Sequence, residues 1–308
     1  AVMRTMLRAY PRVPAVRRVL NRVAAGVGER GSGPPRMIRI RDGVRPEDIA
    51  IGPLGYATVA KQSYASFARL QRDGRIPAGV RFQVSLPSPL APLTGFIPEE
   101  RAVVEPRYTE RLLTELDEIT AAIPHDELAI QWDAAIEFAV LEGVIPTEHA
   151  TPEAAFGPLT DRLVELGNHV PAEVRFGYHL CYGDAGHRHF IEPADTTMLT
   201  RVANAMVDGL DRPMDWLHLP VPRSRTDTAY FAPLRDLRLA DSTELYLGLV
   251  HLTDGVDGGR QRIAAAEQVL TRDFGIATEC GFGRRPRATV PDLLRLHATL
   301  ADRASLAA

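Results

Sequence analysis

The chain has 308 residues, of which 45% are hydrophobic and 24% are charged, and its formal net charge is -3 at pH 7. This length and apolar content are enough for one large α/β domain or two small ones. The slightly negative charge gives no reason to expect nucleic acid as a partner. No apolar run is long enough to predict a membrane-spanning helix. The two cysteines are too few for a disulfide framework, which favours a reducing, cytoplasmic location.

Residues 1–45 are expected to form a basic, partly flexible N-terminal segment. The first 41 residues hold ten arginines and a single acid, Glu29. The stretch "GERGSGPP" (28–35) indicates a break in any helix there, because glycine and proline interrupt helical structure. We interpret the segment as an exposed basic helix followed by a linker. A basic arm or a targeting segment, which would also be Arg-rich and acid-poor, is the alternative.

From residue 46 onward, short apolar runs alternate with amphipathic stretches. Runs of about four to eight nearly continuous apolar residues are typical of strands that are covered on both faces. A weaker candidate for a first strand is "RMIRIRDG" (36–43); otherwise that strand is missing from this chain. The seven better predicted strands lie at 48–56, 80–90, 127–137, 173–183, 214–222, 244–252 and 274–283.

Leucines and isoleucines at helical spacing predict helices between these strands. The alternation of strands and helices implies a parallel sheet. The fold class expected is therefore α/β, a single (β/α)8 TIM barrel over residues 46–308, with its first strand uncertain or missing. Its outer helices would leave room for a homodimer. The main predicted helices are 106–123, 154–170, 195–210, 258–274 and 289–308.

Polar residues collect at the carboxyl ends of the predicted strands. In a barrel this end is the catalytic face, whereas packing of the core alone would not place polar residues there. The residues in question are Gly55, Tyr56, Ser85, Asp133, His179, Cys181, Pro220, His251 and Cys280.

The stretch "RFGYHLCYGDAGHRHF" (175–190) indicates a metal site. His179 and Cys181 are two residues apart on a strand, so both side chains point to the same side. Cys280 follows the last predicted strand, and one histidine with two thiolates suits zinc with an open fourth position. The alternative is a buried free thiol beside an ordinary core histidine. We interpret His187 and His189 as solvated or hydrogen-bonded loop residues.

Three motifs together resemble the C-terminal catalytic domain of cobalamin-independent methionine synthase. They are "IQWDAAIE" (130–137), "YHLCYGD" (178–184) and "TECGFGRRP" (278–286), and their order and separation agree with that family over residues 48–300. The resemblance implies the eight-stranded barrel. It also implies a methyl or alkyl transferase that acts without the folate-binding N-terminal barrel of the long enzymes.

The resemblance implies roles for individual residues. His179, Cys181 and Cys280 match three zinc ligands of the family, and Asp133 matches the aspartate that binds the substrate's amino group. Zinc in such a site binds a substrate thiol and lowers its pKa, so that a thiolate attacks the alkyl donor. The expected partner is a small-molecule thiol or an amino-acid-like substrate. Tyr56 and Ser85 at the predicted mouth are further candidate substrate-binding residues.

The chain departs from the family at two functional positions. Pro220 of "HLPVPRSR" falls where the family has its glutamate ligand, so the site would have three protein ligands or recruit His218 or water. His251 is displaced by two residues from the position of the family's general-acid histidine, and Asp254 follows it. Both are candidate proton-transfer residues. His251 as a strand-end residue bonded to backbone is the alternative.

"GPLGY" (52–56) replaces the acidic motif that helps to hold the substrate's amino group in the methionine synthases. The absence of that acid weakens the case for homocysteine as the substrate.

Two other functions stay open. The same superfamily includes a metal-free decarboxylase of porphyrin precursors, in which arginines at the mouth bind carboxylates. The third possibility is a barrel that binds a small molecule or a partner without catalysis, because a fold does not guarantee a function. The arginines that would serve the lyase are Arg223, Arg225, Arg284 and Arg285.

Overall fold

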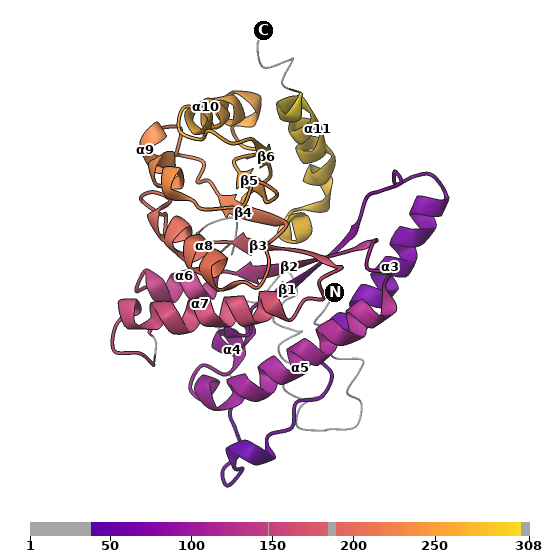
Figure 1. The fold of residues 1–308 in the computed structure, drawn as a ribbon, viewed down its shortest axis with the longest axis vertical. Helices are drawn as coiled ribbons and strands as arrows, with labels where there is room; N and C mark the ends of the chain where they lie inside the picture. The colour runs from indigo at the N-terminus through magenta and orange to yellow at the C-terminus, as the bar shows by residue number, and fades with distance from the viewer. Residues whose placement is uncertain (1–37, 147, 184–188, 303–308) are drawn as a thin grey trace. The chain divides into compact units, whose positions relative to one another are not determined.

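The computed structural model describes residues 38–146, 148–183 and 189–302 of the chain (Figure 1). Six strands alternate with helices, and they are hydrogen-bonded in the order β1-β2-β3-β4-β5-β6. The chain divides into two compact units, and the first boundary between them in the sequence, after Gln131, falls within strand β2 (Leu128–Ala134). The predicted basic segment lies largely outside the described residues, and the single barrel domain over 46–308 stays a prediction.

The first unit contains residues up to Gln131 together with His169–Arg175. Its largest helix, α5, buries Leu112, Leu116 and Ile119 completely. This helix confirms the prediction over 106–123. The elements of this unit before β2 are η1 (Pro46–Asp48), α3 (Tyr56–Arg72), β1 (Phe82–Pro87), α4 (Leu90–Phe96) and α5 (Arg101–Ala122).

The prediction of a strand at 48–56 is wrong. These residues form a short 3-10 turn and a loop that leads into α3. The buried Glu115 carboxylate accepts hydrogen bonds from the backbone N–H groups of Leu54 (2.7 Å), Gly55 (3.2 Å) and Ala57 (2.7 Å). A side chain therefore satisfies the donors that a strand would give to its neighbour. Gly55 has a φ of 95°, a left-handed conformation that ends extended structure and starts the helix.

The candidate strand 36–43 is also not found where the structure describes it. Ile38 donates a backbone hydrogen bond to the Phe96 carbonyl (2.7 Å), and the chain then turns at Gly43, which has a φ of 82°. Residues 36 and 37 lie outside the described residues. Closure of an eight-stranded barrel accordingly stays a prediction.

The second unit contains the end of β2 and the chain from Phe176 onward, with 132–168. Figure 1 shows α8, α9, α10 and α11 arranged around its strands. The predicted strands and helices of this unit are confirmed, most with ends shifted by a few residues. The strand predicted at 274–283 ends at Ile276, the helix predicted at 258–274 ends at Glu267, and residues 303–308 of the last predicted helix lie outside the described residues. Its elements are α6 (Ile136–Leu141), α7 (Pro152–Asn168), β3 (Arg175–Leu180), α8 (Thr197–Gly209), β4 (Trp216–Pro220), α9 (Thr228–Phe231), η2 (Ala232–Asp236), β5 (Glu244–Gly248), α10 (Gly255–Glu267), β6 (Phe274–Ile276), η3 (Phe282–Arg284), η4 (Arg287–Thr289) and α11 (Val290–Ala301).

Strands β3 to β6 pair in parallel and end at one edge. His179 of β3 lies opposite His218 of β4, and Pro220 of β4 lies opposite Gly248 of β5. Leu247 of β5 in turn lies opposite Ile276 of β6. The loops that follow these strands therefore lie next to one another, which is where polar residues were predicted to gather.

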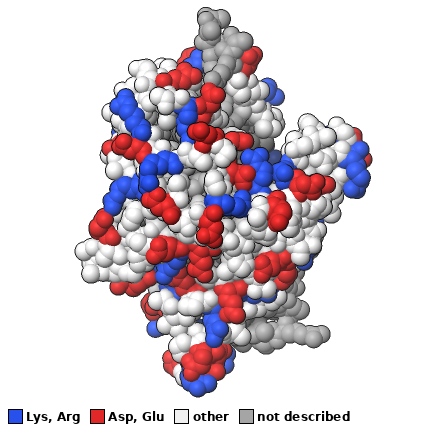
Figure 2. Space-filling model, in the orientation of Figure 1, with Lys and Arg blue, Asp and Glu red and all other residues white. Residues whose placement is uncertain are grey.

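Figure 2 shows positive and negative side chains interspersed over the face drawn there. The described part of that face carries no extended patch of a single sign, in keeping with the small net charge. Among the helices that the structure describes, none has the length and apolar character needed to cross a membrane.

Candidate metal centre

His179, Cys181 and Cys280 come together as the sequence predicted. One potential ligand atom from each lies within 4.8 Å of the others, and all three residues are buried. Cys181 continues the line of β3, because its N–H donates to the Ala134 carbonyl at the end of β2 (2.8 Å). Alternation along this extended segment places Cys181 on the same side as His179. Cys280 arrives from the segment after β6, and both cysteines are free thiols.

The spacing of these donors fits a zinc ion. With Zn–S near 2.3 Å and Zn–N near 2.0 Å, the ligand atoms of a tetrahedral site are about 3.5 to 3.8 Å apart. The two Sγ atoms are 3.2 Å apart, and the whole group lies within 4.8 Å. Shifts of about one ångström in these separations would give tetrahedral geometry. One imidazole and two thiolates are also the donor types that zinc prefers.

His179 is held from two sides. Its Nδ1 lies 3.3 Å from Oδ1 of Asp133, and its Nε2 lies 2.8 Å from the backbone oxygen of Glu279. Burial lowers the pKa of His179, but hydrogen bonds to Asp133 and Cys280 outweigh it and raise the pKa to about 10. A metal bound to one ring nitrogen would displace a proton and leave the other nitrogen with its partner, an arrangement that orients metal-binding histidines.

Cys181 is an uncharged thiol in the absence of a metal. Its hydrogen bond with Cys280 and its burial raise the pKa of Cys181 well above the usual value. The backbone N–H of Gly183 nevertheless donates to its sulfur over 3.2 Å, and this bond favours the thiolate. A divalent cation would reverse the balance, because a coordinated thiol loses its proton.

No fourth protein ligand joins the group in the part of the chain that the structure describes. His218 stacks on His179 with ring centroids 4.4 Å apart, and its Nε2 hydrogen-bonds the Thr278 carbonyl (3.0 Å). Burial and the neighbouring His179 hold the pKa of His218 well below its usual value, so it is a neutral packing residue. Pro220, at the position of the family's glutamate, accepts a hydrogen bond from Tyr230 through its carbonyl.

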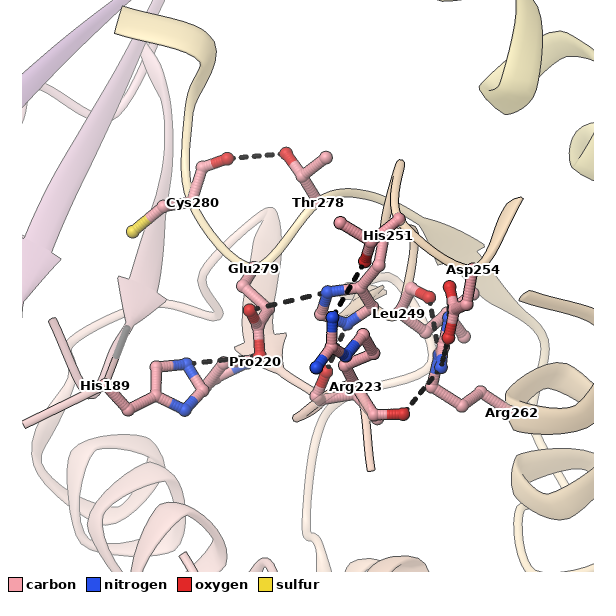
Figure 3. Close-up of polar contacts among 12 residues, drawn as sticks. His189, Pro220, Arg223, Leu249, His251, Asp254, Arg262, Thr278, Glu279 and Cys280 are labelled. Atoms are coloured by element: carbon pink, nitrogen blue, oxygen red, sulfur yellow. Dashed lines mark hydrogen bonds and ion pairs between the residues drawn. The ribbon is translucent and has the colours of Figure 1, made fainter. Parts of the chain in front are cut away.

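Glu279 is a site residue that the sequence analysis missed. Its carboxylate lies between two histidines, with Oε1 3.2 Å from Nε2 of His189 and Oε2 3.6 Å from Nδ1 of His251 (Figure 3). Figure 3 also shows the Cys280 sulfur pointing away from His251. The signal was the acid directly before Cys280 in "TECG". Nδ1 of His189 is hydrogen-bonded to Glu192 over 3.3 Å, which agrees with the interpretation of His189 as a hydrogen-bonded residue. His187 lies outside the described residues.

His251 has one ring nitrogen committed to the backbone. Its Nε2 donates to the Val221 carbonyl over 2.9 Å, so Nδ1 of the neutral ring is an acceptor that faces Glu279. Burial is the main cause that lowers the pKa of His251, to about 4. His251 is therefore neutral at pH 7. The interpretation of His251 as a strand-end residue bonded to backbone thus holds for Nε2, and its proton-transfer role stays a prediction.

Asp254 is held by a buried arginine. Its two oxygens accept from Arg262 over 2.7 and 2.9 Å, and Arg262 also donates to the carbonyls of Leu249 and Arg223. Burial opposes ionisation, but Arg262 holds the pKa of Asp254 below its usual value. Arg262 therefore connects α10 to the loops after β4 and β5. A proton-transfer role for Asp254 stays a prediction.

The three predicted substrate-binding residues have separate surroundings. Asp133 lies beside His179, as described above. Tyr56 and Ser85 belong to the other compact unit: the Tyr56 hydroxyl lies 3.4 Å from that of Tyr108, and Ser85 Oγ accepts from the Gln131 amide over 3.4 Å. The substrate-binding roles of Tyr56 and Ser85 stay predictions.

Comparisons with known proteins give likenesses to solved structures only. No protein-family model matches the chain, and no curated protein matches it. A solved structure from Listeria monocytogenes, described as a vitamin-B12 independent methionine synthase, is similar at 16% sequence identity and a TM-score of 0.44. The match covers 74% of this chain and 66% of that chain, just under two thirds of its length. Its description names the family that the sequence motifs resemble.

Proposed function

We propose that the chain is a zinc-dependent methyl or alkyl transferase that acts on a small-molecule thiol. The observation that carries the proposal is the buried group of His179, Cys181 and Cys280, whose ligand atoms lie within 4.8 Å. Cys181 and Cys280 are 99 residues apart in the sequence, so the fold itself brings them together. The motif resemblance supplies the reaction class.

Three protein ligands suit a catalytic site better than a structural one. Structural zinc sites are closed by four protein ligands, whereas catalytic sites keep a position for water or substrate. A zinc ion held here would lower the pKa of a substrate thiol and make it a nucleophile near neutral pH. The departure at Pro220 is consistent with that open position.

The protein's own residues would orient and protect the reacting groups. Asp133 and the stacked ring of His218 fix the plane of His179. Burial of the three ligands keeps bulk water away from the thiolates. Of the two residues predicted to transfer protons, His251 keeps a ring nitrogen facing Glu279, whereas Asp254 is held by Arg262. We therefore assign that role to His251.

Metal content tests the proposal. Reduced protein reconstituted with zinc and freed of excess metal is expected to hold about one zinc per chain by elemental analysis. Cys280→Ser should lose it, because two remaining ligands bind weakly. His169→Gln is the control, because this histidine lies beside Asp117 and does not belong to the group. Wild-type protein that retains no zinc, or a Cys280→Ser variant that retains it fully, would contradict the proposal.

Thiol binding tests the second half of the proposal. In cobalt-substituted protein, a substrate thiol that enters the open position would add a thiolate-to-cobalt charge-transfer band. A zinc-free protein that binds polycarboxylates but no thiol would instead favour the metal-free lyase of the same superfamily.

A further inference from the structure

Arginines surround the loops after β4, β5 and β6, and two of them are in ion pairs. Arg225 holds Asp227 with two hydrogen bonds of 3.0 Å and lies over the Tyr230 ring. Arg262 is completely buried against Asp254. The charges of these two arginines are therefore neutralised within the protein.

Two other arginines have no carboxylate partner in the part of the chain that the structure describes. Arg223 is exposed, and its guanidinium makes one hydrogen bond, to the Thr253 hydroxyl (3.2 Å). Arg285 has a buried Nε atom without a hydrogen-bond partner. A buried donor that is left unsatisfied is costly, so a guanidinium in this state is ready for an incoming acceptor.

The topology places these two residues on the catalytic side of the unit. Arg223 follows β4 and Arg285 follows β6, while His251 follows β5, the strand between them. The three strands are parallel and in register, so the loops carrying these residues are neighbours. Burial is the main cause of the low pKa of His251, and the charge of Arg285 lowers it further. The charge of Arg223 likewise contributes to the low pKa of Asp254. Both guanidinium groups therefore lie near this edge.

The chemistry that these arginines recognise is an oxyanion. A guanidinium presents parallel N–H donors that match a carboxylate or sulfonate, and the charge strengthens each bond. By contrast, the carboxylates of this region already lie against other groups. Asp133 lies beside His179, Glu279 lies between His189 and His251, and Asp254 is bound by Arg262. Arg223 and Arg285 are therefore the groups of this edge that are available to a charged substrate group.

We propose that Arg223 and Arg285 form an anion subsite, and that the thiol substrate carries a carboxylate or sulfonate group and is bound as a mercapto acid. This inference rests on the proposed function, because it takes the thiol to bind at the metal. It goes further by naming the second anchor of the substrate and the residues that provide it. The amino group of an amino acid is not required for binding.

Cobalt-substituted full-length protein allows a direct test at pH 7 and constant ionic strength. The probes are 3-mercaptopropionate and 2-mercaptoethanesulfonate, with neutral 2-mercaptoethanol and cationic cysteamine as comparisons. The increase in the thiolate-to-cobalt charge-transfer band, above the band that Cys181 and Cys280 give, reports binding of each thiol. We expect both anionic thiols to bind at least about tenfold more tightly than the neutral one, which corresponds to one charge-assisted hydrogen bond. Whichever anion binds more tightly identifies the class.

Variants then assign the effect to residues. Arg223→Gln and Arg285→Gln should each weaken the anionic thiols about tenfold and leave 2-mercaptoethanol within about twofold. Arg225→Gln is the control, because Arg225 is two residues from Arg223 but is already paired. Cobalt content and circular dichroism show whether each variant is folded and loaded.

The outcomes separate the two hypotheses. If all thiols bind with the same affinity in the wild type, or if the two variants weaken charged and neutral thiols equally, the anion subsite is overturned while thiol binding stands. If no thiol of any charge produces the band, the proposed function fails and the subsite fails with it. A charge preference lost in Arg223→Gln or Arg285→Gln but retained in Arg225→Gln supports the subsite.

Discussion

The imidazole of His179 must give up a proton before it can bind a metal. Its pKa of about 10 and the raised pKa of Cys181 mean that both groups are protonated at pH 7. Zinc binding should therefore release at least two protons. Lowering the pH by one unit should weaken zinc binding about a hundredfold, because each released proton contributes about a factor of ten. Calorimetry in buffers of different ionisation enthalpy measures the number released.

The partner of this histidine gives a second prediction at the same scale. Asp133→Asn removes the carboxylate that contacts Nδ1 of His179. We expect zinc affinity to fall about 10- to 100-fold, as is usual when the carboxylate behind a metal-binding histidine is lost. Competition with a chromogenic chelator gives the affinity. Unchanged zinc affinity in Asp133→Asn would show that the carboxylate does not support His179 as a ligand. Binding of the substrate would then be the remaining role predicted for Asp133.

At the scale of elements, the beginning of α3 depends on a carboxylate from α5. Burial would raise the pKa of Glu115, but hydrogen bonds from Ala57, Arg111, Gly55 and Leu54 lower it overall. A folded-state pKa below the unfolded value contributes stability that is present at neutral pH and is lost as the pH falls below about 4.5. The free energy of unfolding should therefore fall with acid more steeply in the wild type than in Glu115→Gln.

Urea unfolding at pH 7 and pH 4 measures this difference. At pH 7, Glu115→Ala should cost about 3 kcal/mol, because three backbone donors and Arg111 lose their acceptor. Equal pH dependence in wild type and Glu115→Gln would mean that this carboxylate does not act as the cap.

Helix α10 connects to the strand-end loops through Arg262. Replacing this residue in Arg262→Leu would leave Asp254 without its partner and the carbonyls of Leu249 and Arg223 without a donor. Loss of one member of a buried ion pair costs about 3 to 5 kcal/mol. Arg238→Leu, which breaks an exposed ion pair with Asp208, is the control and should change stability little. Chemical unfolding gives the loss of stability in each variant. Equal losses would show that the buried ion pair contributes no more to stability than the exposed one.

For the molecule as a whole, local pattern predicted the strands and helices better than it predicted contacts. Continuous apolar runs correctly predicted β1 to β6, because strands covered on both faces need them. The loop at 48–56 has the same composition, but its backbone partner is Glu115, some 60 residues away, and no local pattern reveals that. Helix α3 was not predicted, and its first residue, Tyr56, was assigned to the strand at 48–56.

The site was predictable where strand periodicity decides it. His179 and Cys181 share a side because they are two residues apart, and the motif after β6 indicated Cys280. Glu279 precedes Cys280 by one residue, and its position between His189 and His251 depends on two other loops. Such long-range pairings need the folded chain.

Metal removal should lower the free energy of unfolding of the whole chain, because the ligands come from parts of one unit that are far apart in the sequence. A zinc ion shared by Cys181 and Cys280 would close a loop of 99 residues in the folded state. A ligand that binds only the folded chain at 1,000 times its Kd adds about 4 kcal/mol to the free energy of unfolding. We expect a strong chelator to lower the thermal midpoint by about 5 to 10 °C, given about 2 °C per kcal/mol in a chain of this size. Calorimetry with and without chelator measures the shift. Cys280→Ser should unfold at the lower temperature without chelator, and adding chelator should not change its thermal midpoint. If the chelator lowers the midpoint of this variant as much as that of the wild type, the metal is bound elsewhere.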